Sequence, residues 1–521
     1  MSKKLLKSTV TVGSMTLISR FLGLARDIIL ARLFGAGMGA DAFFVAFKIP
    51  NFMRRLFAEG AFSQAFIPVL TEYKEQRQHK DVKVLVDHVS GVLGGILFLV
   101  TLIGVIAAPI LVMIFAPGFL QDQSKYDLTV SMIRITFPYL LFISLTSLAA
   151  GVLNSYGRFA VPAFTPVFLN LSLIGAALLL GPYFDQPVMA LAWGVFFAGI
   201  IQLLFQLPFL YRLRLLPRPR LGKANEGVAR IRRLMLPAIF GTSVVQINLL
   251  FDTLIASFLV TGSVSWLYYS DRLVEFPLGV FGIALATVIL PALSREHARD
   301  SAERFRRTLD WALRMVVLIA TPAAAGLLVL SQPLLVTIFN YGEFGSHDVE
   351  MASLSLMAYS LGLLGFIMVK VLATGFYAQQ DTKTPVKIGI IAMISNMVMN
   401  VVFVVPMVML DFIGPHAGLA LATSLSGFVN AVLLYRQIVR QGVYRPQAGW
   451  LWLVIRVAIA SGLMSALLYF GIGDMTVWAD WAWWQRAGQL LFWVGAGALV
   501  YFAVLAGLGL RPADLKMTPE I

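Results

Sequence analysis

The sequence predicts an all-α polytopic membrane protein, and three observations carry that prediction. Hydrophobic residues make up 59% of the 521 positions and charged residues only 13%, about half the share of charge that is usual in soluble domains. Apolar stretches recur along the whole chain, and many are long enough to cross a hydrocarbon core about 30 Å thick. Basic residues gather in alternate connections between these stretches, as expected for short loops between membrane spans.

The apolar stretches predict about fourteen transmembrane helices. The first two are the weakest by hydropathy because they contain several charged side chains between Arg20 and Glu59. The other twelve are strongly apolar. The predicted limits are 8–34, 42–70, 89–115, 128–153, 161–182, 188–211, 234–260, 266–292, 309–330, 350–378, 386–410, 417–439, 450–470 and 487–510.

Lysine and arginine are divided unevenly between the two sets of loops. One set holds basic clusters such as 212–233 and 295–307, whereas the other holds little beyond Lys125 and Arg486. The positive-inside bias therefore predicts that both termini are cytoplasmic. This topological role accounts for the net charge of +14, so the charge does not call for a nucleic-acid partner.

Landmark residues recur at a nearly constant spacing, which predicts an internal duplication. Pro68 and Pro291 are separated by 291 − 68 = 223 positions; the same spacing, or 224, separates Pro109 from Pro333, Gly151 from Gly375 and Pro162 from Pro385. Six spans in each repeat give the halves one orientation, so they are parallel repeats. We expect an N-lobe over 1–220 and a C-lobe over 221–445 around a central cavity, plus two additional C-terminal helices over 446–521. Transporters use such lobes for alternating access, although a bundle can also be a static scaffold.

Ionisable residues inside the predicted spans are the candidate functional residues, because a charge in the bilayer interior nearly always faces a cavity, a partner or a substrate path. Basic members outnumber acidic ones, which favours an anionic substrate. Arg55 with Glu59 and Arg272 with Glu275 have the spacing of local ion pairs on a helix. The set comprises Arg20, Arg26, Asp41, Lys48, Arg54, Arg55, Glu59, Asp271, Arg272, Glu275 and Lys370, in which Arg20, Arg26, Arg54 and Lys370 lack an equally obvious local partner.

Several chemistries have no motif in this sequence. There is no cysteine, and no GxxxxGK[ST], HExxH or GxSxG pattern occurs, so we expect no enzymatic activity, no cofactor and no ATP site. Asp252, alone within the seventh span, is a weak candidate ligand for a coupling ion. Pairing with a neighbouring helix is the alternative for this carboxylate.

Four long strings resemble the MurJ/MviN family of lipid II flippases, within the superfamily that includes the MATE drug exporters. The densest is SRFLGLARDIILARLFGAGMGAD, with its continuation to position 73. The others are GSVSWLYYSDRLVEFPLGVFGIALATVILPALS (262–294), KVLATGFYAQQDTKTPVKI (370–388) and GPHAGLALATS (414–424).

The resemblance implies a multi-pass protein of the bacterial inner membrane that moves lipid II, the undecaprenyl-pyrophosphate-linked disaccharide-pentapeptide, to the outer leaflet. It implies that Arg20, Arg26, Arg54, Arg272 and Lys370 bind the pyrophosphate. Asp41, Lys48, Arg55, Glu59, Asp271 and Glu275 would serve gating or charge pairing, and the last two helices would form a groove for the lipid tail.

Energy source and partners follow only as expectations. Membrane potential or an ion gradient would drive transport by a monomer surrounded by membrane lipids, and cell-wall synthesis or division proteins are candidate partners. The alternatives are export of other lipid-linked oligosaccharides or of drugs, and a non-transport role as a membrane-embedded glycosyltransferase or a divisome scaffold.

Overall fold

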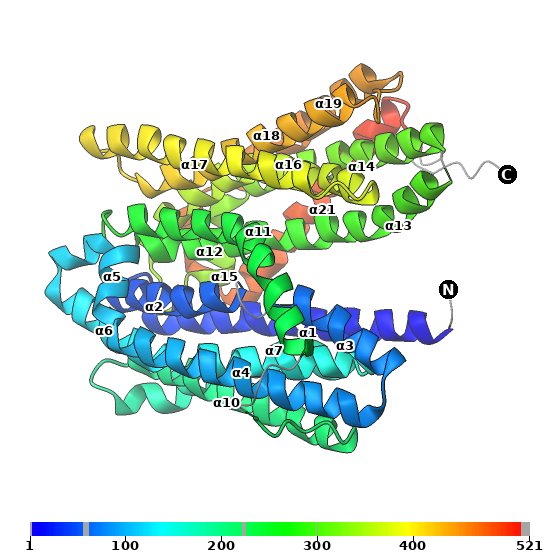
Figure 1. The fold of residues 1–521 in the computed structure, drawn as a ribbon. Helices are drawn as coiled ribbons and strands as arrows, with labels where there is room; N and C mark the ends of the chain where they lie inside the picture. The colour runs from blue at the N-terminus through cyan, green and yellow to red at the C-terminus, as the bar shows by residue number, and fades with distance from the viewer. Residues whose placement is uncertain (1–2, 56–61, 221–225, 300, 512–521) are drawn as a thin grey trace. The chain divides into compact units, whose positions relative to one another are not determined.

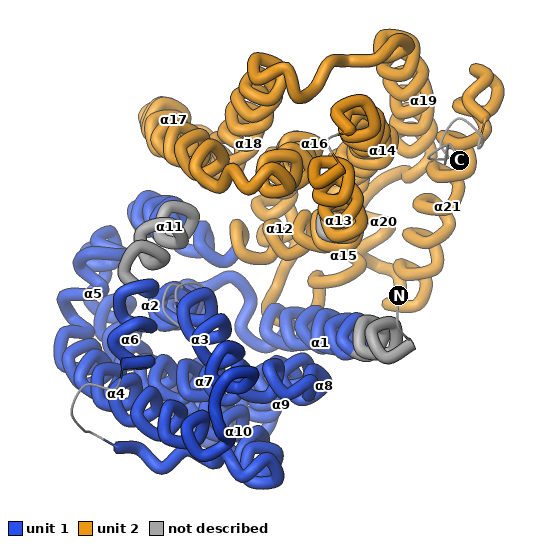
Figure 2. The backbone as a smooth tube through the Cα atoms, turned by 45° about the vertical axis from the view of Figure 1, so that its right-hand side comes forward, with its two compact units in different colours: residues 1–265 blue, residues 266–521 orange. Residues whose placement is uncertain are grey.

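The computed structural model describes residues 3–55, 62–220, 226–299 and 301–511, and every element within them is helical (Figure 1). The chain divides into two compact units, Met1–Ser265 and Trp266–Ile521 (Figure 2). The predicted domain limits at 220 and 445 differ from this division and stay predictions.

Unit 1 combines a few helices of more than 20 residues with a larger number of shorter ones. Its elements are α1(Lys3–Phe34), α2(Met38–Arg54), α3(Ser63–Gln76), α4(His79–Ile106), α5(Ala108–Phe115), η2(Pro117–Gln121), α6(Gln123–Thr136), α7(Tyr139–Ser155), α8(Ala160–Phe164), α9(Pro166–Gly175), η3(Ala176–Leu180), η4(Gly181–Tyr183), α10(Met189–Arg212) and α11(Glu226–Ala256).

Unit 2 also combines long and short helices, and it ends in two long helices with a short one between them, beyond the duplicated region. Its elements are α12(Ser263–Pro277), which begins within unit 1, η5(Leu278–Ile283), α13(Ala284–Ala298), α14(Ala302–Val329), α15(Ser331–Phe339), α16(Ser346–Ala378), α17(Lys383–Met409), α18(His416–Arg440), α19(Trp450–Gly471), α20(Met475–Asp480) and α21(Trp483–Gly507).

Each of the fourteen predicted segments coincides with one or more of these helices. In the described residues, eleven helices are long and apolar enough to cross a membrane. The first, second and seventh predicted segments fall outside that set. In α1 the reason is charge, since Arg20, Arg26 and Asp27 interrupt its apolar run.

Helix boundaries repeat at the spacing that the sequence landmarks predict. Helix α4 and helix α14 each contain 28 residues, and both their starts (302 − 79 = 223) and their ends (329 − 106 = 223) are 223 positions apart. The start of α6 and the end of α7 precede those of α16 by the same 223 positions, since 346 − 123 and 378 − 155 both equal 223. The duplication therefore extends to where individual helices begin and end.

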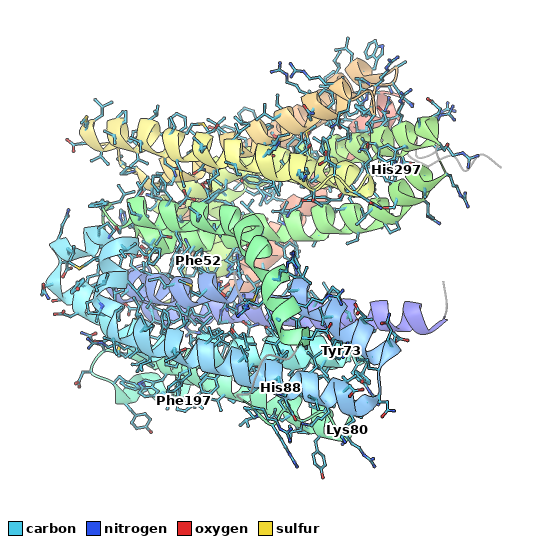
Figure 3. All side chains as sticks on the ribbon, viewed as in Figure 1. Phe52, Tyr73, Lys80, His88, Phe197 and His297 are labelled. Atoms are coloured by element: carbon cyan, nitrogen blue, oxygen red, sulfur yellow. The ribbon has the colours of Figure 1, made fainter. Side chains whose placement is uncertain are left out.

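Each unit has its own apolar core, and its outer surface is apolar as well. One core joins α3, α4 and α7 in unit 1, and another joins α14, α19 and α21 in unit 2. Apolar side chains on the outside include Ile103 and Ile106 on α4, exposed by 64% and 70%, and Phe197 on α10 (Figure 3). Soluble monomers rarely expose apolar patches of this extent, so these surfaces suit a hydrocarbon surrounding.

Candidate functional site

Arg26 on α1 is buried and held by two side chains. Its Nε and Nη2 both donate to Asp27 Oδ1, at 2.9 and 2.7 Å, and its Nη1 donates to Asn170 Oδ1 on α9 at 3.0 Å. Asn170 Nδ2 in turn donates to the carbonyl of Ser19 on α1 at 3.1 Å. The expectation that Arg26 lacks a local partner is wrong, because the long arginine side chain bends back to the adjacent carboxylate.

Asp41, in the first turn of α2, is fully buried and accepts four hydrogen bonds. Lys125 Nζ on α6 and the amide of Gly262 donate to Oδ2, each at 2.8 Å. The amide and hydroxyl of Ser265 donate to Oδ1 at 3.0 and 2.6 Å. Asp122 caps α6 by accepting from the Lys125 amide at 3.1 Å, which fixes the helix start that carries this lysine. Charge pairing, one of the two roles predicted for Asp41, is therefore present.

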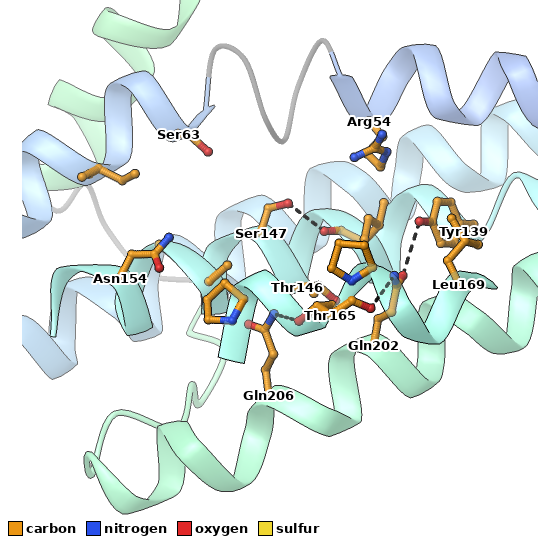
Figure 4. A pocket seen from close by; sticks show the side chains of 16 residues that line it. Arg54, Ser63, Tyr139, Thr146, Ser147, Asn154, Thr165, Leu169, Gln202 and Gln206 are labelled. Atoms are coloured by element: carbon orange, nitrogen blue, oxygen red, sulfur yellow. Dashed lines mark hydrogen bonds between the residues drawn. The ribbon is translucent and has the colours of Figure 1, made fainter. Parts of the chain in front are cut away.

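Arg54, at the end of α2, borders a cavity of about 390 Å³ in unit 1 that both polar and apolar residues line (Figure 4). Its Nε donates to Asn51 Oδ1, one turn earlier, at 2.9 Å. Helices α3, α7, α8, α9 and α10 supply the other walls. The lining residues are Arg54, Ser63, Ile67, Tyr139, Ile143, Thr146, Ser147, Ala150, Gly151, Asn154, Pro162, Thr165, Pro166, Leu169, Gln202 and Gln206.

A chain of hydrogen bonds orders one wall of this cavity. Tyr139 donates its hydroxyl to Gln202 Oε1 at 3.3 Å, and Gln202 Nε2 donates to the carbonyl of Thr165 at 3.2 Å. Gln206 Nε2 donates to Thr165 Oγ1 at 2.8 Å. Gln206 Oε1 is buried and has no hydrogen-bond partner among the described residues. The wall is thus ordered by hydrogen bonds and retains one unused acceptor.

The predicted residues of unit 2 are more exposed. Arg272 Nη1 donates to Glu275 Oε2 at 2.8 Å, which confirms the predicted pair, and its guanidinium lies 4.9 Å from the ring centre of Tyr268. Asp271 beside it on α12 and Lys370 on α16 are also exposed. These positions leave the side chains accessible to a ligand.

The remaining predicted residues of unit 1 fall into three situations. Arg20 is exposed on α1, and Lys48 and Arg55 are half-buried. Glu59, and with it the predicted Arg55–Glu59 pair, lies outside the described residues. Among the described residues no three His, Asp or Glu side chains gather closely enough to hold a metal ion, and a coupling-ion role for Asp252 stays a prediction.

Two buried contacts were not predicted from the sequence, and both involve the basic residues of the loop set that is otherwise poor in lysine and arginine. Lys125 pairs with Asp41, as described above. Arg486, at the start of α21, is buried and donates to the carbonyls of Trp481, Val336, Asn340 and Ala479 at 2.6–3.1 Å. Their isolation on a face that otherwise lacks positive charge is the signal that could have identified them.

Comparison with known proteins assigns the family. A family model described as lipid II flippase MurJ matches residues 30–482. The chain belongs to the MurJ family of lipid II flippases. The probable lipid II flippase MurJ of Vibrio cholerae is 51% identical over 100% of this chain and 99% of its own length. That of Haemophilus influenzae is 46% identical over 96% and 99%, and the MurJ of Burkholderia cenocepacia is 44% identical over 89% and 90%.

Solved structures agree with this membership. A structure described as lipid II flippase MurJ in an inward closed conformation covers 95% of this chain and 98% of its own, with 25% identity and a TM-score of 0.78. An inward-facing multidrug transporter of the MATE family covers 83% of this chain at 15% identity, with a TM-score of 0.62, which is a likeness of fold alone. The MurJ family consists of transporters and not enzymes, and this multi-pass chain has their fold.

Proposed function

We propose that this protein transports lipid II from the inner to the outer leaflet of the bacterial cytoplasmic membrane by alternating access. The observation that carries the proposal is its membership of the MurJ family along the whole chain, at 51% identity to the Vibrio cholerae relative. Arg26, buried on α1, and Arg54, at the border of the cavity in unit 1, supply cationic groups for an anionic lipid headgroup. Arginine suits this task because its planar fork binds phosphate oxygens in pairs.

The proposed architecture has fourteen spans: two parallel six-helix repeats around a central cavity, followed by α19 and α21 as a groove for the lipid tail. The repeated helix boundaries at a spacing of 223 support the duplication. Parallel repeats are a common basis for alternating access, in which one lobe rocks against the other around the substrate.

Both termini are proposed to be cytoplasmic. Lys125 is neutralised by Asp41, and Arg486 is surrounded by backbone carbonyls. The two exceptions in the non-basic loop set are therefore structural residues that are not exposed in the loops. This strengthens the positive-inside argument, which rests on exposed basic residues in the opposite set.

Arg20, Arg26, Arg54, Arg272 and Lys370 are proposed to bind the pyrophosphate, with Asp41 in gating. Turnover would draw on membrane potential or an ion gradient, because no phosphate-binding loop for ATP occurs in the sequence. We expect the protein to act as a monomer among membrane lipids, and cell-wall synthesis or division proteins are the candidate partners.

The test is complementation of a strain depleted of its own lipid II flippase, with surface-exposed lipid II as the readout. Wild type should restore exposure, whereas Arg26→Ala and Arg272→Ala at equal expression should not. Arg445→Ala is the matched control, because Arg445 is an exposed arginine in the loop before α19. Wild type that is well expressed but fails to restore exposure would transfer the proposal to another lipid-linked oligosaccharide. Rescue by all variants would keep the flippase and remove these arginines from its site.

A further inference from the structure

The cavity inside unit 1 has the chemistry of a ligand site, separate from any ion pair described above. Its volume of about 390 Å³ lies within the range of small-molecule pockets, about 300–1,000 Å³. Tyr139, Asn154, Gln202 and Gln206 bring hydroxyl and amide groups to it from α7 and α10 (Figure 4). A pocket lined by a few convergent polar groups among apolar ones is the usual form of a specific site.

Two of these amides retain hydrogen-bonding capacity. Gln206 Oε1 is buried and has no partner among the residues that the structure describes, although Gln206 Nε2 donates to Thr165. Turning the amide over would exchange the two atoms and still leave one of them unused. Asn154 lines the same cavity, and its side-chain amide makes no hydrogen bond to a described residue. A buried polar atom without a partner is costly, so a ligand or water that bonds to it is favoured.

The lining also determines the charge of the occupant. Among the described residues that line the cavity, none is a carboxylate and Arg54 is the one charged side chain. These residues therefore offer an ammonium group no counter-charge. The amides and hydroxyls instead match a neutral ligand rich in hydroxyl and acetamido groups, while Pro162, Pro166 and Leu169 offer apolar surface to the face of a ring.

We propose that this cavity binds the acetamido sugar that is bonded directly to the pyrophosphate of the lipid substrate. This rests on the proposed function, in which Arg54 binds the pyrophosphate. The first sugar is covalently attached to that pyrophosphate, so a phosphate held by Arg54 at the border brings this sugar, and no more distant group, to the amides. Helix α9 connects this cavity with Arg26, because its Leu169 lines the cavity and its Asn170 accepts a hydrogen bond from Arg26.

The test compares binding of three lipids to purified protein in detergent, measured by native mass spectrometry. The lipids are lipid II, undecaprenyl pyrophosphate, and the undecaprenyl-pyrophosphate-linked disaccharide without its peptide. Gln206→Leu and Asn154→Leu should weaken binding of both sugar-bearing lipids roughly three- to tenfold, as expected for the loss of one hydrogen bond. Binding of undecaprenyl pyrophosphate should not change, whereas Arg54→Ala should weaken binding of all three.

Matched controls separate this proposal from the function on which it rests. Gln186→Leu alters an exposed glutamine of the same unit and should change no affinity. Asn154→Leu removes no hydrogen bond within the described residues, so it serves where Gln206→Leu lowers stability. Equal weakening of the lipid without sugar, or weakening that requires the peptide, would overturn the sugar assignment. Wild type that does not bind lipid II would overturn the proposed function itself.

Discussion

Asp87 and Asp310 occupy equivalent positions 223 residues apart (310 − 87 = 223), and each anchors the segment that follows the last helix of its repeat. Asp87 on α4 accepts from the amide of Arg218 at 2.7 Å and from the Lys83 ammonium. The Arg220 backbone then crosses α4 so closely that a Cβ at Gly91 would lie 2.4 Å from its carbonyl oxygen.

Asp310 anchors the segment after α18 in the same way, but through different hydrogen-bond donors. Asp310 on α14 accepts from the Tyr444 hydroxyl and Trp450 Nε1, both at 2.7 Å, and from the Gln447 amide at 3.3 Å. Arg314 Nε donates to its other oxygen at 2.6 Å. A carboxylate at the equivalent position thus anchors the segment after α10 in one repeat and the lead into α19 in the other.

Substituting either carboxylate should destabilise its unit. Asp310→Asn places an amide NH₂ where donors converge, and hydrogen bonds to charged groups are worth about 1.5–3 kcal/mol each, so we expect a loss of roughly 2–3 kcal/mol and a lower Tm in detergent. Asp87→Asn should lower Tm as well. Asp480→Asn, at an exposed position, is the control, and an Asp310→Asn variant as stable as this control would contradict the anchoring role.

Alkaline pH should weaken the contact between Asp310 and Tyr444, which lies in the loop between α18 and α19. Burial, and then the hydrogen bond to Asp310, raise the pKa of Tyr444 above its ordinary value of 10.0. The folded protein therefore retains the phenol proton to higher pH than the unfolded chain, and the associated stability is complete below about pH 10 and declines as pH rises above it. Melting curves between pH 8 and pH 11 should show a smaller alkaline decline for Tyr444→Phe than for wild type; parallel declines would refute this.

The Asp41–Lys125 pair should behave as a buried ion pair in a double-mutant cycle. Lys125→Met leaves the carboxylate buried without its counter-charge, and breaking such a pair costs about 3–5 kcal/mol. Adding Asp41→Asn should recover part of that loss, because the uncompensated charge is then gone. Thermal unfolding in detergent measures each corner of the cycle. Lys80→Met, at an exposed position on α4 (Figure 3), should be nearly neutral, and strictly additive single-variant effects would exclude coupling.

Much of the helical architecture could be predicted because hydropathy and length are local properties of the chain. The breaks within spans were missed for an equally physical reason. The predicted segment 89–115 is uninterrupted in hydropathy, yet α4 ends at Ile106 and α5 begins at Ala108, with Pro109 in its first turn. Proline cannot donate a helical hydrogen bond and is tolerated at a helix start. Its position therefore marks a break that an apolarity profile does not register.

The candidate site was predictable only where partners are close in sequence. The Arg272–Glu275 pair follows from a spacing of three residues. Asp41 and Lys125 are separated by 84 positions, and Arg26 and Asn170 by 144, so their contacts depend on how helices pack. Adjacent residues do not face each other on a helix, which is why Asp27 was overlooked as the partner of Arg26.

Arg26→Lys distinguishes the arginine fork from its charge. A lysine keeps the positive charge but presents one nitrogen, so it cannot bond to Asp27 and Asn170 together while meeting a phosphate in bidentate fashion. We expect at least a tenfold loss of lipid II flipping in reconstituted vesicles, about 1.4 kcal/mol of barrier, with a smaller effect on Tm. Asn170→Ala should slow flipping less, since the Asp27 contact remains. Arg445→Lys provides the matched control, and full activity of Arg26→Lys would mean that charge alone suffices at this position.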